Sequence, residues 1–197
     1  FVLDLSNPAE PKVAGELKIP GYSSYLHPYD ENYVIGLGIE NNNLQLSLFN
    51  VTKVNAPTEI AKYTIQGDYT QSDALYEPKA FLFNKEKQLL VIPVSITQYG
   101  VVPQSSTEPT DKEIGIAPTQ GGYWQGAYVF KITLSGFELQ GGVTHQENTN
   151  QQYYYGDYNQ NMNRALYIGN TLYTISNAKV KLNNLTDLAQ IAEIQLN

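Results

Sequence analysis

Short runs of alternating apolar and polar residues recur along the chain, and no long stretch has the 3.6-residue period of an amphipathic helix. In LQLSLFNV (44–51), Leu44, Leu46 and Leu48 alternate with other residues, and EIAKYTI (59–65) alternates again after an Asn- and Pro-containing connection. A period of two on both sides of turn-forming residues predicts a β-hairpin. The pattern therefore predicts an all-β protein.

The hairpin is part of an internal repeat. NPAEPKVAGELKI (7–19) matches KVNAPTEIAKYTI (53–65), and looser copies follow in the segments that begin near residues 130 and 180. A second kind of hairpin lies between these copies, so each unit contains four strands. The interval before the third copy is longer because residues 97–122 are rich in Pro, Gly, Ser and Thr, which predicts one long loop.

Repeated four-strand units of about 40 to 50 residues are typical of β-propeller blades. A stack of β-sandwiches is the main alternative, but sandwich strands do not recur as matched four-strand units. The repeat predicts about three and a half blades of antiparallel strands: a half blade at 1–20 and blades at about 22–67, 70–147 and 160–197.

Propellers close with roughly four to eight blades. We therefore expect the sequence to be part of a larger propeller, whose exposed sheet edges pair with further blades or with a second copy of the chain.

Charge and composition narrow the classes of partner. Twelve basic and nineteen acidic residues give a formal net charge of −7, which disfavours binding to nucleic acid or to an anionic membrane surface. The longest apolar run, LLVIPVSI (89–96), is too short to cross a bilayer. The absence of Cys excludes thiol catalysis by this chain. Sixteen Tyr and many polar residues are common in exported proteins that lack disulfides.

Four segments carry a family resemblance: YLHPYDENYVIGLGIE (25–40), ALYEPKAFLFNKEKQLLVIPVSI (74–96), YWQGAYVFKI (123–132) and DLSNPAEPKVAGEL (4–17). The first three resemble secreted archaeal and bacterial proteins with a C-terminal β-propeller domain, which is distantly similar to WD40-type propellers. The fourth resembles the LVIVD-type repeat of extracellular bacterial propellers. The resemblance implies a propeller fold and an extracellular or cell-surface setting, and it implies no particular reaction.

Catalytic signatures are missing from the sequence. It contains no H-E-x-x-H, G-x-S-x-G or P-loop spacing, and two histidines are too few for a three-His zinc site. His27 aligns with Phe83 of the next blade, so we interpret it as a structural or channel-lining residue. His145 ends an outer strand, where we expect it to be solvated.

Acidic residues gather in GDYTQSDALYEPK (67–79). Asp68, Asp73 and Glu77, with nearby carbonyls, offer the hard oxygen ligands that calcium prefers. The alternative is a solvated loop in which Asp side chains cap turns. Calcium is the one cofactor that the sequence suggests.

Aromatic residues are dense in three predicted loops, which include Trp124 and the run Tyr153, Tyr154 and Tyr155. On exposed loops these side chains would stack on sugar rings or anchor a protein partner. The alternative interpretation is that Trp124 packs between blades and the tyrosines cover blade edges.

Two hypotheses of function follow. The first is an exported binding or scaffold module that presents its loops to a protein or glycan partner at the cell surface. The second is a hydrolase or lyase that acts on a polymer in the central channel, where the innermost strands would contribute His27, Glu77, Lys79 and Arg164.

Overall fold

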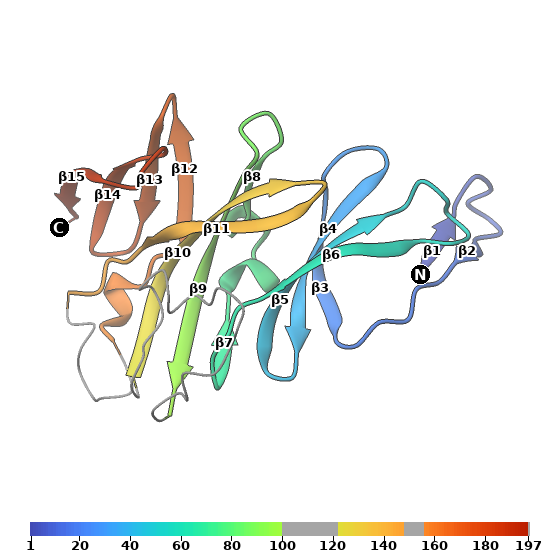
Figure 1. The fold of residues 1–197 in the computed structure, drawn as a ribbon, viewed down its shortest axis with the longest axis horizontal. Coiled ribbons are helices and arrows are strands. Elements are labelled where there is room, and N and C mark those ends of the chain that lie inside the picture. The colour runs from blue at the N-terminus through green and yellow to red at the C-terminus, as the bar shows by residue number, and fades with distance from the viewer. Residues whose placement is uncertain (100–121, 148–155, 197) are drawn as a thin grey trace.

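The alternating segments form β-strands in the computed structural model, which describes residues 1–99, 122–147 and 156–196. These residues form four antiparallel sheets, and the helical segments among them are three short 3-10 helices. Figure 1 shows the sheets following one another in chain order, with the N-terminus at one end of the molecule and the C-terminus at the other. Within the described ranges, no helix has the length and apolar character that crossing a membrane requires.

The first sheet contains two strands, β1 (Val2–Asp4) and β2 (Lys12–Gly15). The second sheet contains four strands in sequential order, namely β3 (Tyr22–Pro28), β4 (Tyr33–Glu40), β5 (Asn43–Asn50) and β6 (Thr58–Thr64). The β4–β5 hairpin turns at Asn41 and Asn42, which have φ values of 50° and 67°. Asparagine tolerates this left-handed region, so the two residues suit a tight hairpin turn.

The third sheet has five strands because its first position is shared by two short strands. The long strand β9 (Leu89–Gln98) pairs with both β7 (Tyr69–Gln71) and β8 (Leu82–Asn84), and β10 (Gly122–Thr133) and β11 (Gly136–Val143) complete the sheet. Two 3-10 helices lie between β7 and β8, namely η1 (Asp73–Leu75) and η2 (Pro78–Ala80). The chain therefore leaves the sheet after β7 and returns to it at β8, on the same side of β9.

The fourth sheet again has four sequential strands, β12 (Arg164–Ile168), β13 (Thr171–Ile175), β14 (Lys179–Asn184) and β15 (Gln190–Gln195). The helix η3 (Tyr158–Gln160) precedes it. The β12–β13 hairpin turns at Gly169 and Asn170, and Gly169 has a φ of 61°, a conformation that glycine adopts without strain.

Two apolar cores hold neighbouring sheets together. The larger core joins the second and third sheets, and fully buried side chains such as Ile35, Leu46 and Phe130 belong to it. The smaller core joins the third and fourth sheets through residues such as Val91, Val129, Met162 and Leu172. Each fully buried aliphatic side chain contributes roughly 1.5–3 kcal/mol, so these faces account for most of the cohesion between sheets.

Candidate functional site

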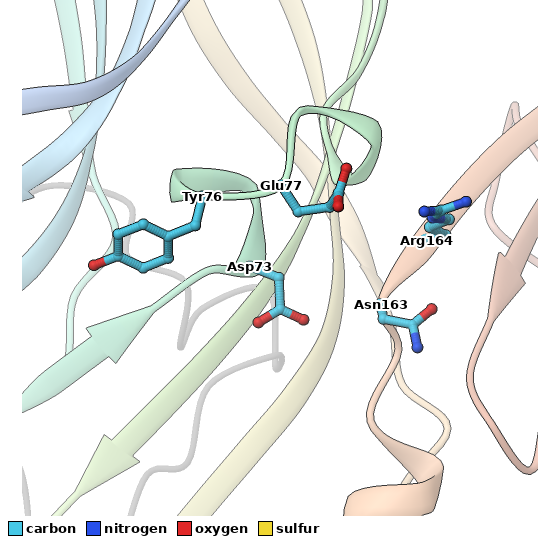
Figure 2. A pocket seen from close by; sticks show the side chains of 5 residues that line it. All are labelled: Asp73, Tyr76, Glu77, Asn163 and Arg164. Carbon is cyan, nitrogen blue, oxygen red and sulfur yellow. The ribbon is translucent and has the colours of Figure 1, made fainter.

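A pocket of about 500 Å³ lies between the third and fourth sheets. Asp73, Tyr76 and Glu77 line it from the η1–η2 segment, and Asn163 and Arg164 line it from the start of β12. Figure 2 shows these two groups of side chains, with Asp73 and Glu77 lying between Tyr76 and the Asn163–Arg164 pair. The site therefore depends on how the two sheets are placed.

Capping residues fix the η1–η2 wall. The Ser72 hydroxyl accepts a hydrogen bond from the Ala74 N–H at the start of η1, and the Glu77 carboxylate accepts one from the Lys79 N–H at the start of η2. These are the residue types that end a strand and begin a helix, and Pro78 suits the first position of η2. Three buried apolar side chains anchor the segment to the core, namely Ala74, Leu75 and Ala80. The polar side chains of the segment lie at its surface.

Gln125 fixes the opposite wall. This side chain is 3% exposed, and its Nε2 donates to the Met162 carbonyl at 2.7 Å while its Oε1 accepts from the Met162 N–H at 2.8 Å. The next residue, Asn163, donates its N–H to the Ile175 carbonyl at 2.9 Å. The backbone that carries Asn163 and Arg164 is thus tied to both neighbouring sheets.

The pocket combines opposite charges that are not paired with each other. Within the described part of the chain, Arg164 makes no ion pair with either Asp73 or Glu77. Desolvation by the surrounding protein raises the pKa of Asp73. A ligand in the gap would therefore meet hydrogen-bond acceptors from one wall and donors from the other.

The structure brings together two of the four channel residues predicted from the sequence. Glu77 and Arg164 share the pocket, whereas Lys79 is exposed on η2 and does not line it. His27 is half-buried against the rings of Phe81 and Phe83, and its Nδ1 lies 2.9 Å from the Tyr25 hydroxyl. Burial lowers the pKa of His27, so the ring is neutral at neutral pH.

The three predicted calcium ligands do not converge. Asp73 and Glu77 share the pocket, but the Asp68 carboxylate accepts hydrogen bonds from Gln98 Nε2 at 2.8 Å and from the Tyr99 N–H at 2.6 Å. Among the described residues, no three acidic or histidine side chains form a group suited to a metal ion. Calcium binding stays a prediction.

Trp124 lies within β10, where the sequence indicated an exposed loop. Its indole is 6% exposed and packs against the Tyr128 ring at a centroid distance of 5.1 Å. Trp124 therefore belongs to the core between sheets, as in the alternative interpretation. Tyr153, Tyr154 and Tyr155 lie outside the described residues.

The prediction that His145 is solvated is wrong. His145 is fully buried between the segment after β11 and the fourth sheet, with Nδ1 2.9 Å from Ser176 Oγ and Nε2 2.8 Å from Thr174 Oγ1. Burial, together with the positive charges of Lys181 and Lys179, lowers the pKa of His145 to about 4. The ring is therefore neutral at pH 7 and joins two sheets by hydrogen bonds.

Sequence reasoning missed Tyr76 and Asn163 as pocket residues. Tyr76 is 77% exposed, and Asn163 follows the Met162 backbone that Gln125 holds. The Ser72 and Glu77–Pro78 capping signals mark the break in the strand, so they indicate that Tyr76 lies outside the sheet. No comparable local signal marks Asn163, because the contact that places it comes from another sheet.

Comparison with known proteins gives one family match and two archaeal relatives. The family model described as a beta propeller domain matches residues 1–188. An uncharacterised protein of Archaeoglobus fulgidus is 46% identical over 99 residues, which cover 50% of this chain and 16% of that protein. An uncharacterised protein of Methanocaldococcus jannaschii is 33% identical over 177 residues, which cover 89% of this chain and 21% of that protein.

The chain thus spans between 16% and 21% of the length of these two relatives. Among solved structures, the AfRom2 CNH domain matches with a TM-score of 0.32 and 8% identity, over 98% of this chain and 59% of that one.

Proposed function

Because this chain belongs to the beta propeller domain family, we propose that it is a binding module of an exported protein and that it takes up a glycan in the pocket between the third and fourth sheets. The observation that supports this proposal best is the pocket lining, which combines two carboxyl groups, an amide, a guanidinium and an exposed tyrosine. These side chains match the chemistry of a sugar.

Each sugar hydroxyl both donates and accepts hydrogen bonds. A hydroxyl in the pocket would donate to Asp73 or Glu77 and accept from Arg164 or Asn163, so it would bridge two walls that make no ion pair with each other. The ring of Tyr76 offers an apolar face for the C–H groups of the sugar and a polar tip for its hydroxyls.

A glycan fits this pocket better than a protein partner does. The centre of a protein interface is typically apolar and depleted in charge, whereas four of the five residues that line the pocket are charged or carry an amide. The net charge of −7 also disfavours nucleic acid. The composition and the resemblance to secreted propellers support an extracellular or cell-surface setting, which fractionation of the native cells would test.

A glycan array tests the proposal directly. We expect Arg164→Ala, Tyr76→Ala and Glu77→Gln each to weaken binding of the retained glycan by roughly tenfold or more. Glu77→Gln keeps an oxygen that can cap η2 and removes the charge. Lys79→Ala is the matched control, because Lys79 is exposed on the same segment and does not line the pocket. Equal binding by all four variants and the wild type would contradict the proposal.

A second candidate function is that of a hydrolase or lyase, which would cleave a polymer in the same pocket by hydrolysis or by elimination. Two carboxyl groups share the pocket, and desolvation raises the pKa of Asp73, which would favour Asp73 as the proton donor of the pair. Glycoside hydrolysis uses one protonated and one ionised carboxyl group. Release of reducing ends from a bound polysaccharide, abolished by Asp73→Asn, would favour this function over binding alone.

A further inference from the structure

Two triplets of the sequence match the acceptor pattern for N-linked glycosylation, which is Asn-x-Ser/Thr with x other than proline. They are Asn50-Val51-Thr52 and Asn184-Leu185-Thr186. Such triplets also arise by chance in a chain rich in asparagine, so the structure has to decide whether they suit the modification. An acceptor asparagine must lie at the surface, with its side-chain nitrogen available for a bond to the sugar.

Both asparagines occupy the same place in their sheets. Asn50 ends β5 and Asn184 ends β14, which are the third strands of the second and fourth sheets. The residue after each asparagine donates its N–H to the turn between the first two strands, to the Asn32 carbonyl at 2.8 Å in the second sheet and to the Asn170 carbonyl at 2.9 Å in the fourth. The two triplets are therefore equivalent, and they lie at the same end of their sheets.

Each asparagine uses its oxygen in a turn and leaves its nitrogen unused. Asn50 Oδ1 accepts from the Thr52 N–H at 2.9 Å, and Asn184 Oδ1 accepts from the Thr186 N–H at 2.8 Å. Both threonines are exposed. Among the described residues, neither Nδ2 has a hydrogen-bond partner and neither is a buried atom. Each Nδ2 is therefore open to solvent while the turn is formed.

The turn itself does not require asparagine. In the first sheet, the Asp4 carboxylate accepts from the Ser6 N–H at 2.9 Å, and in the third sheet Thr133 Oγ1 accepts from the Ser135 N–H at 3.1 Å. Aspartate and threonine thus satisfy the fold at this kind of position. An asparagine adds a nitrogen that can carry a sugar and that the turn does not use.

The Asn184 triplet lies at the end of the fourth sheet that is farther from the pocket. Arg164 lines the pocket and begins β12, whereas Asn170 lies in the turn beyond the other end of that strand. Asn170 Nδ2 donates to Asn184 Oδ1 at 3.0 Å. Because a strand rises about 3.3 Å per residue, the length of β12 separates the triplet from the pocket. A glycan on Asn184 would leave the pocket accessible.

We propose that Asn50 and Asn184 carry N-linked glycans. The inference rests on the exported setting proposed above, because the sugar donor is a lipid-phosphate-linked oligosaccharide that a transferase of the cell presents at a membrane. Nδ2 attacks C1 of the donor sugar and loses one proton. The bond between Nδ2 and C1 forms, the bond between C1 and the phosphate oxygen breaks, and the lipid phosphate leaves with that electron pair.

Mass spectrometry of the protein purified from its native cells tests both sites. Trypsin cleaves after Lys18, Lys53 and Lys181, so the two asparagines fall in different peptides. We expect each peptide to carry a glycan on its asparagine in most copies of the protein. Thr52→Ala and Thr186→Ala should each abolish one glycan and keep the turn, because the turn uses the backbone N–H of that residue.

Two further variants keep the test independent of folding. Asn50→Asp and Asn184→Asp retain the oxygen that accepts in the turn and remove the nitrogen, so each should lose one glycan and stay folded by circular dichroism. Asn55 is the matched internal control, because it is exposed in the loop that follows Asn50 and Ala56-Pro57 follow it in place of the required triplet. It should carry no glycan.

An unmodified peptide in the exported protein would overturn the assignment of its asparagine and leave the proposed function standing. A glycan that persists in the alanine and aspartate variants would overturn the assignment as well. If cell fractionation finds the protein inside the cell and unmodified, the exported setting fails and this inference fails with it. Binding of a glycan in the pocket is decided separately by the array.

Discussion

Gln125 and Met162 are joined by two hydrogen bonds, from Gln125 Nε2 to the Met162 carbonyl at 2.7 Å and from the Met162 N–H to Gln125 Oε1 at 2.8 Å. Both residues are buried, so a variant without the amide leaves two backbone groups without partners. Gln125→Ala should therefore lower the free energy of unfolding by about 2–4 kcal/mol in urea denaturation. It should also weaken glycan binding, because Asn163 and Arg164 follow Met162 directly.

Two variants sharpen this prediction. Gln125→Glu keeps the acceptor for the Met162 N–H and loses the donor, so its effect on binding should be intermediate. Gln140→Ala is the matched control, because Gln140 is exposed on β11 and its side chain donates to the Glu138 carbonyl of the same strand. A Gln125→Ala protein that binds as the wild type does would show that the pocket wall is held by other contacts.

His145 makes stability depend on pH. Its pKa is about 4 in the folded protein, well below its ordinary value of 6.5, so the unfolded chain binds more protons between these values. The free energy of unfolding should fall as pH drops from about 6.5 to 4, by about 3 kcal/mol in total. Urea denaturation between pH 4 and 7 measures this slope.

His145→Gln provides the control for that slope. The amide can replace one of the two hydrogen bonds to Thr174 and Ser176 and carries no titrating group. The variant should be less stable at pH 7 and should lose this part of the pH dependence. The same slope in the variant and the wild type would assign the effect to other groups whose pKa values the fold shifts, such as His27 and Glu193.

The fold class was predictable because it depends on short-range patterns. The period of two at Leu44, Leu46 and Leu48 predicted a strand with one buried face, and β5 places all three in the core. The β-propeller prediction from the repeated four-strand units is confirmed by the family match over residues 1–188. The blade limits and the number of blades in the whole propeller stay predictions.

The burial and contacts of individual side chains were less predictable, because they depend on residues of neighbouring sheets. His145 follows the last strand of the third sheet, so its local sequence indicates a loop, but Thr174 and Ser176 of the next repeat enclose it. Trp124 shows the same limit, since pairing with Ile96 extends β10 into a segment that looked like a loop. Glu77 and Arg164 were predicted together at the innermost strands, and both line the pocket.

Replacement of Asp73 should change glycan affinity and the free energy of unfolding in opposite directions. Desolvation raises its pKa, so the folded protein favours the neutral acid and loses stability as pH rises above the pKa of the unfolded chain. Asp73→Asn should therefore increase the free energy of unfolding at pH 7, and this gain should vanish near pH 3, where Asp73 is protonated in both states. The same variant should weaken glycan binding, because the amide accepts fewer hydrogen bonds than the carboxylate.

The comparison of binding and unfolding distinguishes a site residue from a structural one. A structural role for Asp73 would make Asp73→Asn less stable at pH 7. Its glycan binding would then fall only in proportion to the fraction of protein that is unfolded. Increased stability together with reduced affinity is the result that the pocket geometry predicts.

Lys179 is a buried cation whose partners are not buried. Its side chain is 2% exposed, and its Nζ lies 2.8 Å from Glu147 and 3.2 Å from Glu193, whose side chains are 65% and 25% exposed. Removal of Lys179 therefore leaves no fully buried charge without a partner, unlike the usual broken buried pair. Lys179→Met, which keeps most of the volume, should change the free energy of unfolding by less than about 1.5 kcal/mol.

Lys179→Ala separates packing from charge at the same position. It removes the ion pairs as Lys179→Met does, and it also leaves a cavity between the segment after β11 and the fourth sheet, so it should lower stability by about 2 kcal/mol more. Urea denaturation of both variants at low and high salt tests this difference. Equal losses of about 3 kcal/mol or more in the two variants would contradict this expectation. If salt also lowers the free energy of unfolding of the wild type but not of the variants, the ion pairs rather than the packed side chain hold the segment to the sheet.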